Sequence, residues 1–271
     1  MNKEYDVLIV EDESVVLAAI KKILEPEKLV VDAAVDVETA LEKLRRNIYR
    51  LIISDLMLPK ISGYDFIRVI KEKYPYIPLI VITGYATLEN ALQSFNMGSF
   101  DFIPKPFDTE ALLGVIQRGM KYSEKMHALG PNKQVCFPLS LPPRMDQNLC
   151  GLHCLGHHAW AKLEENGTAL IGVGDTFPEM IKDLDRIEFH LSNDEIIQGK
   201  CCAQLISKNG LVNMFWAPLS GSVTAINHEL ESNVQLVNTS PFDEGWLLRI
   251  IPVIPAEELK HLTCCEKRSA D

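Results

Sequence analysis

The sequence has no hydrophobic run long enough to cross a membrane. Apolar residues make up 47% of the 271 residues and charged residues 24%, as is typical of globular proteins. No stretch approaches the roughly 20 apolar residues that span a bilayer. The first residues, Met-Asn-Lys-Glu-Tyr-Asp, also lack the basic and then apolar order of a secretory signal peptide. We therefore expect a cytoplasmic protein without membrane insertion.

Basic residues are scarce in the second half of the chain. Residues 151–262 contain 7 basic and 15 acidic side chains, a net charge of −8, whereas residues 1–122 contain 15 and 18, a net charge of −3. A module that binds duplex DNA needs a basic face that displaces phosphate counterions. The charge distribution therefore argues against nucleic acid as a partner.

The seven cysteines lack the spacing of a secreted disulfide framework. Their number is odd, and two pairs, Cys201-Cys202 and Cys264-Cys265, are adjacent in sequence. Disulfide frameworks belong mainly to small secreted domains. The cysteine pattern therefore agrees with a cytoplasmic location.

Residues 1–122 alternate short apolar runs with amphipathic stretches. The apolar runs predict strands at 6–10, 29–34, 51–54, 78–82 and 102–103. Helical periodicity predicts helices at 14–24, 37–47, 63–73, 88–97 and 108–122. This alternation is typical of a doubly wound α/β domain, in which a five-stranded parallel sheet is covered on both faces. Ligands of such sheets bind at the carboxyl ends of the strands.

The rest of the chain has a different character. Residues 123–150 contain Gly130-Pro131 and Pro142-Pro143 and keep no period, so we expect a linker there. Residues 151–262 are expected to form a mostly-β domain with short helices near 176–183, 227–232 and 255–262, and residues 263–271 a flexible tail. The β-like runs lie at 158–163, 168–173, 186–190, 200–207, 211–216, 222–226 and 246–251.

Polar residues follow four of the five predicted parallel strands. Glu11 and Asp12 follow the first, Asp55 the third, Thr83 ends the fourth and Lys105 follows the fifth. If these strands are neighbours, the carboxylates share one pocket, and their mutual repulsion favours a bound cation such as Mg²⁺. A carboxylate can attack a phosphoryl group, whose oxygens Mg²⁺, an ammonium and a hydroxyl can stabilise. We therefore predict that Asp55 is a phosphoacceptor, with Lys105 and Thr83 assisting.

Residues 4–122 resemble the receiver domain of two-component response regulators. The resemblance implies a flavodoxin-like fold and phosphorylation of Asp55 by a sensor histidine kinase. The matching segments are Leu8-Ile9-Val10-Glu11-Asp12-Glu13, Asp55-Leu56-Met57-Leu58-Pro59 with Gly63, Thr83-Gly84, and Lys105-Pro106-Phe107 after Gly98-Ser99-Phe100-Asp101-Phe102.

The same resemblance implies roles for individual residues. Glu11, Asp12, Asp55 and the backbone carbonyl of Met57 would bind Mg²⁺. Thr83 and Phe102 would reorient together when the phosphoryl group arrives. The Lys105–Pro106 peptide bond is expected to be cis. Met57 and Tyr85 would tune dephosphorylation.

Residues 150–262 resemble the glycine cleavage H protein, which implies a lipoyl-type β-sandwich or flattened barrel. In that family a lysine at a hairpin tip carries lipoate. Counting seven positions back from Ala217 reaches Gly210, and ten forward from Gly199 reaches Asn209, so neither count finds lysine. Lys208 is adjacent, and two interpretations stay open: a lipoyl attachment site, or a solvated turn lysine. The matching segments include His158-Ala159-Trp160, Ile171-Gly172-Val173, Ala217-Pro218-Leu219-Ser220-Gly221-Ser222-Val223 and Pro241-Phe242-Asp243-Glu244-Gly245-Trp246-Leu247.

A group of cysteines and histidines lies at the start of the second domain. Zn²⁺ prefers such ligands, but no second Cys/His pair at finger spacing follows them. A structural metal site and a set of ordinary loop residues are therefore both open. The group consists of Cys150, His153, Cys154, His157 and His158.

The leading interpretation is a response regulator with no enzymatic activity beyond its own phosphorylation and dephosphorylation. Phosphorylation of Asp55 would shift the face formed by the fourth helix, fifth strand and fifth helix, changing homodimer formation or docking of the acidic domain to a downstream protein. One alternative is a lipoate carrier that uses Lys208 under phosphorylation control. Another is a metal or oxidant sensor that uses the Cys150–His158 group.

Overall fold

The computed structural model describes residues 3–129 and 151–264, apart from residues 157, 175–176, 178–179, 182 and 192. The chain divides into two compact units, within residues 1–134 and 135–271. No helix in the described ranges combines the length and hydropathy that a bilayer crossing needs. The expected linker lies mostly outside these ranges.

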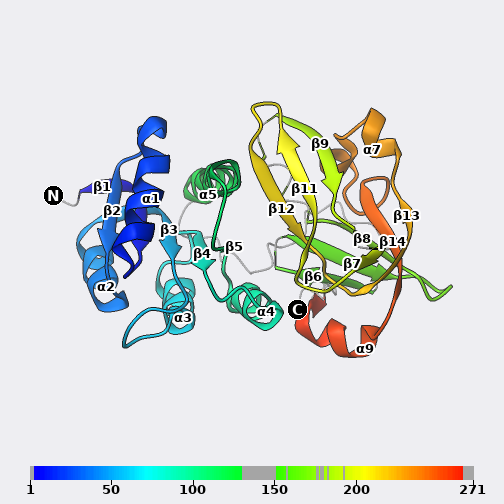
Figure 1. The fold of residues 1–271 in the computed structure, drawn as a ribbon, viewed down its shortest axis with the longest axis horizontal. Helices are drawn as coiled ribbons and strands as arrows, with labels where there is room; N and C mark the ends of the chain where they lie inside the picture. Colours follow the sequence, from blue (N-terminus) through cyan, green and yellow to red (C-terminus); the bar gives the residue numbers. More distant parts are fainter. Residues whose placement is uncertain are drawn as a thin grey trace. The chain divides into compact units, whose positions relative to one another are not determined.

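The first unit is an α/β domain with one parallel sheet. The sheet order is β2-β1-β3-β4-β5, so the first, third, fourth and fifth strands are neighbours, as predicted. Helices α1 and α5 cover one face of the sheet, and α2, α3 and α4 cover the other (Figure 1). The strands are β1 Glu4–Val10, β2 Val31–Ala34, β3 Ile48–Ser54, β4 Leu79–Thr83 and β5 Asp101–Pro104. The helices are α1 Ser14–Leu24, α2 Val37–Arg46, α3 Gly63–Lys73, α4 Leu88–Met97 and α5 Thr109–Leu129, with a 3₁₀ turn at Glu25–Glu27.

Burial on both faces explains why the strands are continuous apolar runs. Residues 7–10 of β1 are fully buried, and all five residues of β4 are buried. Side-chain caps fix the starts of three helices: the side chains of Asp36, Ser62 and Thr87 accept hydrogen bonds from the backbone at the starts of α2, α3 and α4.

Helix α5 is longer than predicted. We expected it to end at residue 122, but it continues to Leu129. No glycine or proline interrupts residues 120–129, and Met126 is buried, so the apolar face of the helix extends past the predicted end.

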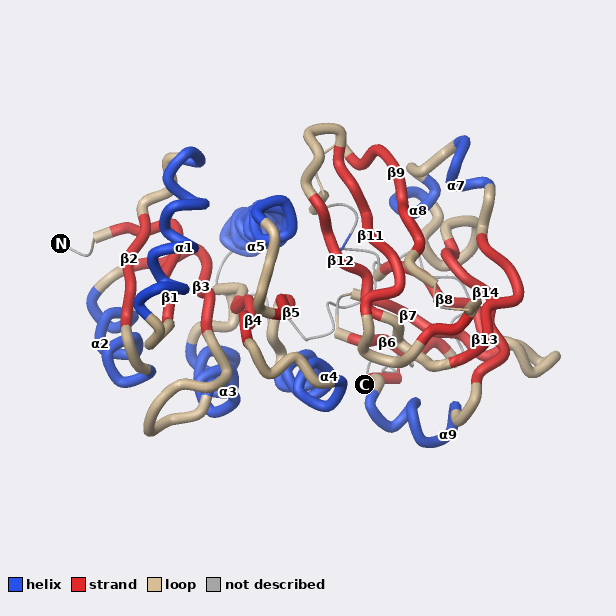
Figure 2. The backbone as a smooth tube through the Cα atoms, in the orientation of Figure 1, coloured by secondary structure: helices blue, strands red, loops and turns tan. Residues whose placement is uncertain are grey.

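The second unit consists mainly of antiparallel strands, which Figure 2 shows in red. One sheet has the order β10-β13-β14-β8-β7-β6-β15, and a smaller sheet has the order β12-β11-β9. Trp160 is fully buried and packs against Leu152, Phe242 and Trp246. The strands are β6 Leu152–Leu155, β7 Ala159–Leu163, β8 Ala169–Val173, β9 Leu184–Phe189, β10 Glu195–Ile196, β11 Cys201–Ser207, β12 Val212–Trp216, β13 Gly221–Ile226, β14 Trp246–Pro252 and β15 Thr263–Cys264. The helical segments are α7 Glu229–Ser232, α8 Leu236–Thr239, α9 Pro255–Glu258 and a 3₁₀ turn at Leu259–His261.

All seven predicted β runs overlap strands of the second unit, but the sequence did not indicate β6, β10, β15 or α8. Strands β10 and β15 have two residues each, too few to show an alternation. Thr263 and Cys264 pair with Cys154 and His153, so these two residues are sheet, where a flexible tail was expected. The helix expected at 176–183 lies partly outside the described residues.

Candidate functional site

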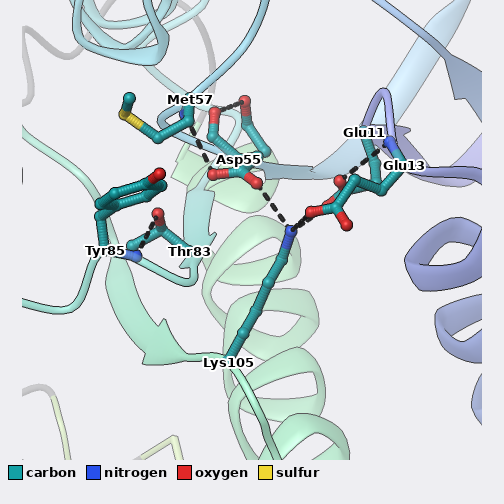
Figure 3. A network of polar contacts seen from close by, with 8 residues as sticks. Glu11, Glu13, Asp55, Met57, Thr83, Tyr85 and Lys105 are labelled. Atoms are coloured by element: carbon teal, nitrogen blue, oxygen red, sulfur yellow. Dashed lines mark hydrogen bonds and ion pairs between the residues drawn. The ribbon is translucent and has the colours of Figure 1, made fainter.

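The predicted site residues of the first unit lie at the carboxyl edge of the parallel sheet. Glu11 follows β1, Asp55 follows β3, Thr83 is the last residue of β4, and Lys105 follows β5. Because the strands are parallel and adjacent, their ends meet at one edge. Figure 3 shows the side chains of Glu11, Asp55 and Lys105 converging there.

Lys105 connects the two buried carboxylates. Its Nζ lies 2.6 Å from Asp55 Oδ2 and 2.8 Å from Glu11 Oε2. The exposed fractions of the Asp55 and Glu11 side chains are 5% and 2%, and that of Lys105 is 12%. An ammonium placed between two carboxylates offsets the repulsion that burial would otherwise strengthen.

The pKa values of Glu11 and Lys105 reflect this arrangement. Burial raises the pKa of Glu11 above its usual value, although the ion pair with Lys105 opposes the shift. Burial by itself would lower the pKa of Lys105, but its hydrogen bonds and charge interactions with Asp55 and Glu11 outweigh that effect and raise it. Lys105 is therefore a cation at neutral pH.

The loop after β3 holds the Asp55 carboxylate from the other side. The backbone N–H of Met57 donates to Asp55 Oδ1 at 3.0 Å. The N–H of Gly63 donates to Leu56 O at 2.9 Å, and a Cβ at Gly63 would lie 2.5 Å from Asp55 O. Glycine at this position lets the start of α3 pack directly against the backbone that carries Asp55.

Thr83 and Phe102 are both buried residues of the sheet. Thr83 is fully buried, and its hydroxyl oxygen accepts a hydrogen bond from the backbone N–H of Tyr85 at 3.2 Å. Phe102, on β5, is 1% exposed. Tyr85 is largely exposed. The Lys105–Pro106 bond is cis, which confirms that expectation.

The carboxylates that the structure brings together differ in one member from the predicted set. Carboxylate oxygens of Glu11, Glu13 and Asp55 lie within 4.8 Å of one another. Asp12, the predicted member, is exposed and is not part of this group. Glu13 also lies 3.5 Å from Lys105 Nζ. The sequence analysis singled out acids at strand ends, whereas Glu13 lies just before α1, where the helix dipole alone is enough to explain an acidic residue.

This oxygen-rich group suits a hard divalent cation. Carboxylate and carbonyl oxygens are the ligands that Mg²⁺ prefers, and it commonly binds through one or two carboxylates. Among the described residues, Glu11, Glu13 and Asp55 form the only group of three or more His, Cys, Asp or Glu side chains whose ligand atoms lie close together. The residues present therefore fit Mg²⁺.

In the second unit, Lys208 lies at the tip between β11 and β12. Its side chain is exposed, and its backbone N–H donates to Asp183 O at 2.9 Å. Gly210 adopts a φ of +83° and donates to Ser207 O, which closes a tight turn. The tip is thus a short turn whose backbone is hydrogen-bonded to Asp183, the residue before β9.

The cysteine and histidine group is only partly described, because Cys150 and His157 lie outside the described residues. Cys154 is disulfide-bonded, so it has no thiolate to offer a metal. The His158 ring is buried and packs on Phe177, with ring centroids 4.9 Å apart. His153 Nδ1 lies 2.9 Å from Gly151 O. These contacts argue against the predicted alternative of a zinc site.

Two family models match the chain, one in each unit. The model of the response regulator receiver domain matches residues 7–117, and the model of the glycine cleavage H-protein matches residues 152–270. The glycine cleavage system H protein of Shewanella halifaxensis is 34% identical over 100 residues, which cover 37% of this chain and 77% of that protein.

Response regulators are among the similar proteins. The response regulator protein FleR of Pseudomonas aeruginosa is 32% identical over 148 residues, covering 53% of this chain and 29% of that protein. The DNA-binding transcriptional regulator NtrC of Proteus hauseri is 28% identical over 117 residues, covering 43% and 25%. The chain thus spans less than a third of the length of these two relatives.

A solved CheY-like receiver domain protein of Methanospirillum hungatei is 32% identical, with a TM-score of 0.42, over 46% of this chain and 98% of that one. The five-stranded parallel sheet is that of a flavodoxin-like receiver, and the antiparallel second unit agrees with an H-protein-like sandwich. The chain carries a response regulator receiver domain at residues 7–117 and belongs, through residues 152–270, to the glycine cleavage H-protein family.

Proposed function

We propose that this chain is a response regulator that accepts a phosphoryl group from a sensor histidine kinase on Asp55. The observation that carries the proposal is the position of Lys105, whose ammonium contacts the buried carboxylates of Asp55 and Glu11 at the carboxyl edge of the sheet. A protein that only needed a stable sheet edge would gain little from three buried charges, because desolvation offsets most of their attraction. In phosphoryl transfer the same charges have a use.

The chemistry follows from the atoms present. An Asp55 carboxylate oxygen attacks the phosphorus of a phosphorylated kinase histidine, forming an oxygen–phosphorus bond while the bond between phosphorus and the imidazole nitrogen breaks. Met57 N–H holds Oδ1, and Lys105 lies beside Oδ2 to neutralise charge on the acyl phosphate. The Thr83 hydroxyl, once turned from Tyr85, donates to a phosphoryl oxygen. In this proposal the chain catalyses only its own phosphorylation and dephosphorylation.

Mg²⁺ belongs to the same proposal. Glu11, Asp12, Asp55 and the Met57 carbonyl are the ligands we propose, and Glu13 is a further candidate because of its distance to Glu11 and Asp55. When bound, the ion supplies positive charge to the phosphoryl oxygens.

Intact-mass spectrometry tests the phosphoacceptor directly. The full chain, incubated with acetyl phosphate and Mg²⁺, should gain the mass of one phosphoryl group, and Asp55→Asn should gain none. Asp65→Asn is a matched control, because Asp65 is a partly exposed carboxylate at the start of α3 and pairs with Arg68. Uptake by Asp55→Asn at the rate of the unchanged chain would exclude Asp55 as the acceptor.

The acidic H-protein-like domain is the proposed output, acting through protein–protein contact and without nucleic acid. Its net charge of −8 over residues 151–262 supports this assignment, since phosphate binding requires the opposite charge. The downstream protein and a phosphorylation-dependent homodimer are tested together. Beryllofluoride with Mg²⁺, a phosphoryl mimic, should change either the mass in light scattering or the set of proteins captured from the native cell. The same result with and without the mimic would contradict this output.

A lipoate carrier is the second candidate, because Lys208 is an exposed lysine at a hairpin tip of an H-protein-like domain. The hairpin turn argues for an ordinary surface lysine: the backbone of Lys208 is bonded to Asp183 O, and the counts from both sides reach Asn209 and Gly210 instead. Expression with a lipoate ligase and lipoate decides between them. A single species at the unmodified mass excludes the carrier, and a lipoyl adduct lost in Lys208→Arg establishes it.

A metal or oxidant sensor receives little support from Cys154, Cys201 and Cys202. Burial raises the pKa of Cys201 to about 11 and that of the buried Cys202 further, so both are protonated thiols at neutral pH and react slowly. Cys154 is disulfide-bonded. Metal analysis of the purified chain tests this alternative. The cytoplasmic location is a separate matter and stays a prediction.

A further inference from the structure

A continuous series of hydrogen bonds joins Thr83 to helix α3. Thr83 Oγ1 accepts from the N–H of Tyr85 at 3.2 Å. The carbonyl of Tyr85 accepts from the side-chain amide of Asn90 at 2.6 Å. Asn90 Oδ1 then accepts from the hydroxyl of Tyr64, on α3, at 2.8 Å. The loop between β4 and α4 is therefore attached at one end to the candidate phosphorylation site and at the other to two helices.

The backbone N–H of Asn90 has an acceptor of its own and does not compete for these side-chain contacts. Thr87, the residue that caps α4, accepts from the Asn90 N–H at 3.2 Å, and the Thr87 N–H itself donates to Tyr85 O at 2.9 Å. Burial raises the pKa of Tyr64, so its hydroxyl is protonated and can donate. The amide of Asn90 thus uses its donor on the loop and its acceptor on α3.

These contacts oppose the movement that phosphorylation requires. If Asp55 carries a phosphoryl group, the Thr83 hydroxyl has to turn from Tyr85 toward it. The N–H of Tyr85 then loses its acceptor unless the loop moves as well. The loop cannot follow freely, because Asn90 and Thr87 both hold Tyr85 O.

We infer that Asn90, held by Tyr64, is a latch that stabilises the resting position of the loop between β4 and α4, and that phosphorylation at Asp55 must open it. The inference rests on the proposed phosphorylation of Asp55. Asn90 and Tyr64 are positioning residues: neither contacts Asp55, and both act through Tyr85. A latch of this kind sets how strongly a phosphoryl group shifts the chain from its resting conformation to its active one.

Loss of the latch should make activation easier. One hydrogen bond is worth about a threefold to tenfold change in an equilibrium constant. The apparent dissociation constant of a ligand equals its intrinsic value divided by the fraction of protein in the binding-competent state. Tyr64→Phe, which removes only the hydroxyl, and Asn90→Ala should therefore each bind beryllofluoride about threefold to tenfold more tightly.

The experiment titrates beryllofluoride into the full chain with saturating Mg²⁺ and measures the bound fraction by fluorine NMR. The set comprises the unchanged chain, Tyr64→Phe, Asn90→Ala and the double variant. Asn47→Ala is the matched control, since Asn47 Nδ2 donates to Tyr49 OH at 3.3 Å where α2 meets the start of β3, at the opposite edge of the sheet. Thermal unfolding without beryllofluoride is recorded for each variant.

Tighter binding in both latch variants, no further gain in the double variant and no change in Asn47→Ala support the latch, because Tyr64 acts through Asn90. Unchanged or weaker binding in Tyr64→Phe overturns it, whatever happens to Asn90→Ala, since the hydroxyl deletion leaves the helix backbone intact. A lower unfolding temperature with unchanged affinity would show a merely structural role and also overturns it. Failure of the unchanged chain to bind beryllofluoride instead refutes the proposed function, and the latch with it.

Discussion

Lys105 is the residue on which the charge balance of the site depends. It is the cation beside two carboxylates that are almost completely buried, and burial, with a smaller contribution from the Asp55 charge, raises the pKa of Glu11. Removing the ammonium leaves two buried like charges without their partner. The strain that results is electrostatic, so another cation should relieve it.

We therefore predict that Lys105→Ala lowers the free energy of unfolding at neutral pH by about 3 kcal/mol. We also predict that Mg²⁺ raises the free energy of unfolding of Lys105→Ala by more than it raises that of the unchanged chain. Because the folded pKa of Glu11 is raised, the destabilisation from ionising Glu11 is absent below its unfolded pKa, grows as the pH rises between the unfolded and folded pKa values, and is complete above the folded one. The deficit should shrink as the pH falls and Glu11 takes up a proton. Urea unfolding at several pH values, with and without excess MgCl₂, measures both effects.

Lys60→Ala is the control for this prediction. Lys60 pairs with Glu38 at 2.8 Å, but both side chains are more than half exposed. Its removal should change stability little and without dependence on Mg²⁺. An equal response to Mg²⁺ in Lys105→Ala and in the unchanged chain would contradict the account of Lys105.

At the scale of elements, the start of α3 sets the position of Asp55. A Cβ at Gly63 would lie 2.5 Å from both Asp55 O and Leu56 Cα, which are backbone atoms and cannot rotate away. We expect Gly63→Ala to destabilise the chain by about 1–3 kcal/mol and to slow phosphoryl uptake, because α3 or Asp55 has to move. Gly84→Ala is the control, since a Cβ there meets nothing within 4 Å. Equal stability of the two variants would show that α3 adapts without moving Asp55.

A second element-scale contact ties β2 to α2 and β3. Asp32 accepts from Lys43 Nζ and from Tyr49 OH, each at 2.7 Å. Burial would raise the pKa of Asp32, but these hydrogen bonds outweigh burial and lower it. A lowered folded pKa gives stability that is present above the unfolded pKa and lost as the pH falls through the folded one.

We therefore predict that Asp32→Asn costs about 1–2 kcal/mol near pH 7, and that the difference from the unchanged chain shrinks only below the ordinary pKa of an unfolded aspartate, about 3.9. Urea midpoints from neutral pH downward provide the measurement. A difference that stays constant across that range would mean that the charge of Asp32 contributes nothing to the fold.

The sequence predicted the elements whose signal is long and periodic. All five parallel strands and five helices of the receiver were located, because buried strands read as continuous apolar runs. Strands β10 and β15 were missed, since two residues carry no period. In the site, Glu11, Asp55 and Lys105 were found because they end or follow strands. Glu13, and the contact between Tyr64 and Asn90, depend on how side chains from separate elements meet, which no local pattern records.

At the scale of the whole molecule, a receiver is joined to a domain of another family. The matched FleR and NtrC sequences cover about half of this chain, which itself covers only 29% of FleR and 25% of NtrC. Their names therefore say nothing of the output here, and the acidic charge of residues 151–262 is the better guide. The domain limits predicted from the sequence, at 1–122, 123–150, 151–262 and 263–271, assign the signal to the first segment and the response to the third, although helix α5 extends the first segment to Leu129 and Thr263–Cys264 belong to a sheet of the second unit.

The most direct test of this account is to locate the acyl phosphate chemically. Borohydride reduces an aspartyl phosphate to homoserine, and trypsin cleavage after Arg50 and Lys60 releases Asp55 in the peptide of residues 51–60. After treatment with acetyl phosphate and Mg²⁺, the account predicts homoserine at position 55 and at no other aspartate. Homoserine elsewhere, or an unmodified Asp55 in chain that has gained phosphoryl mass, would contradict it.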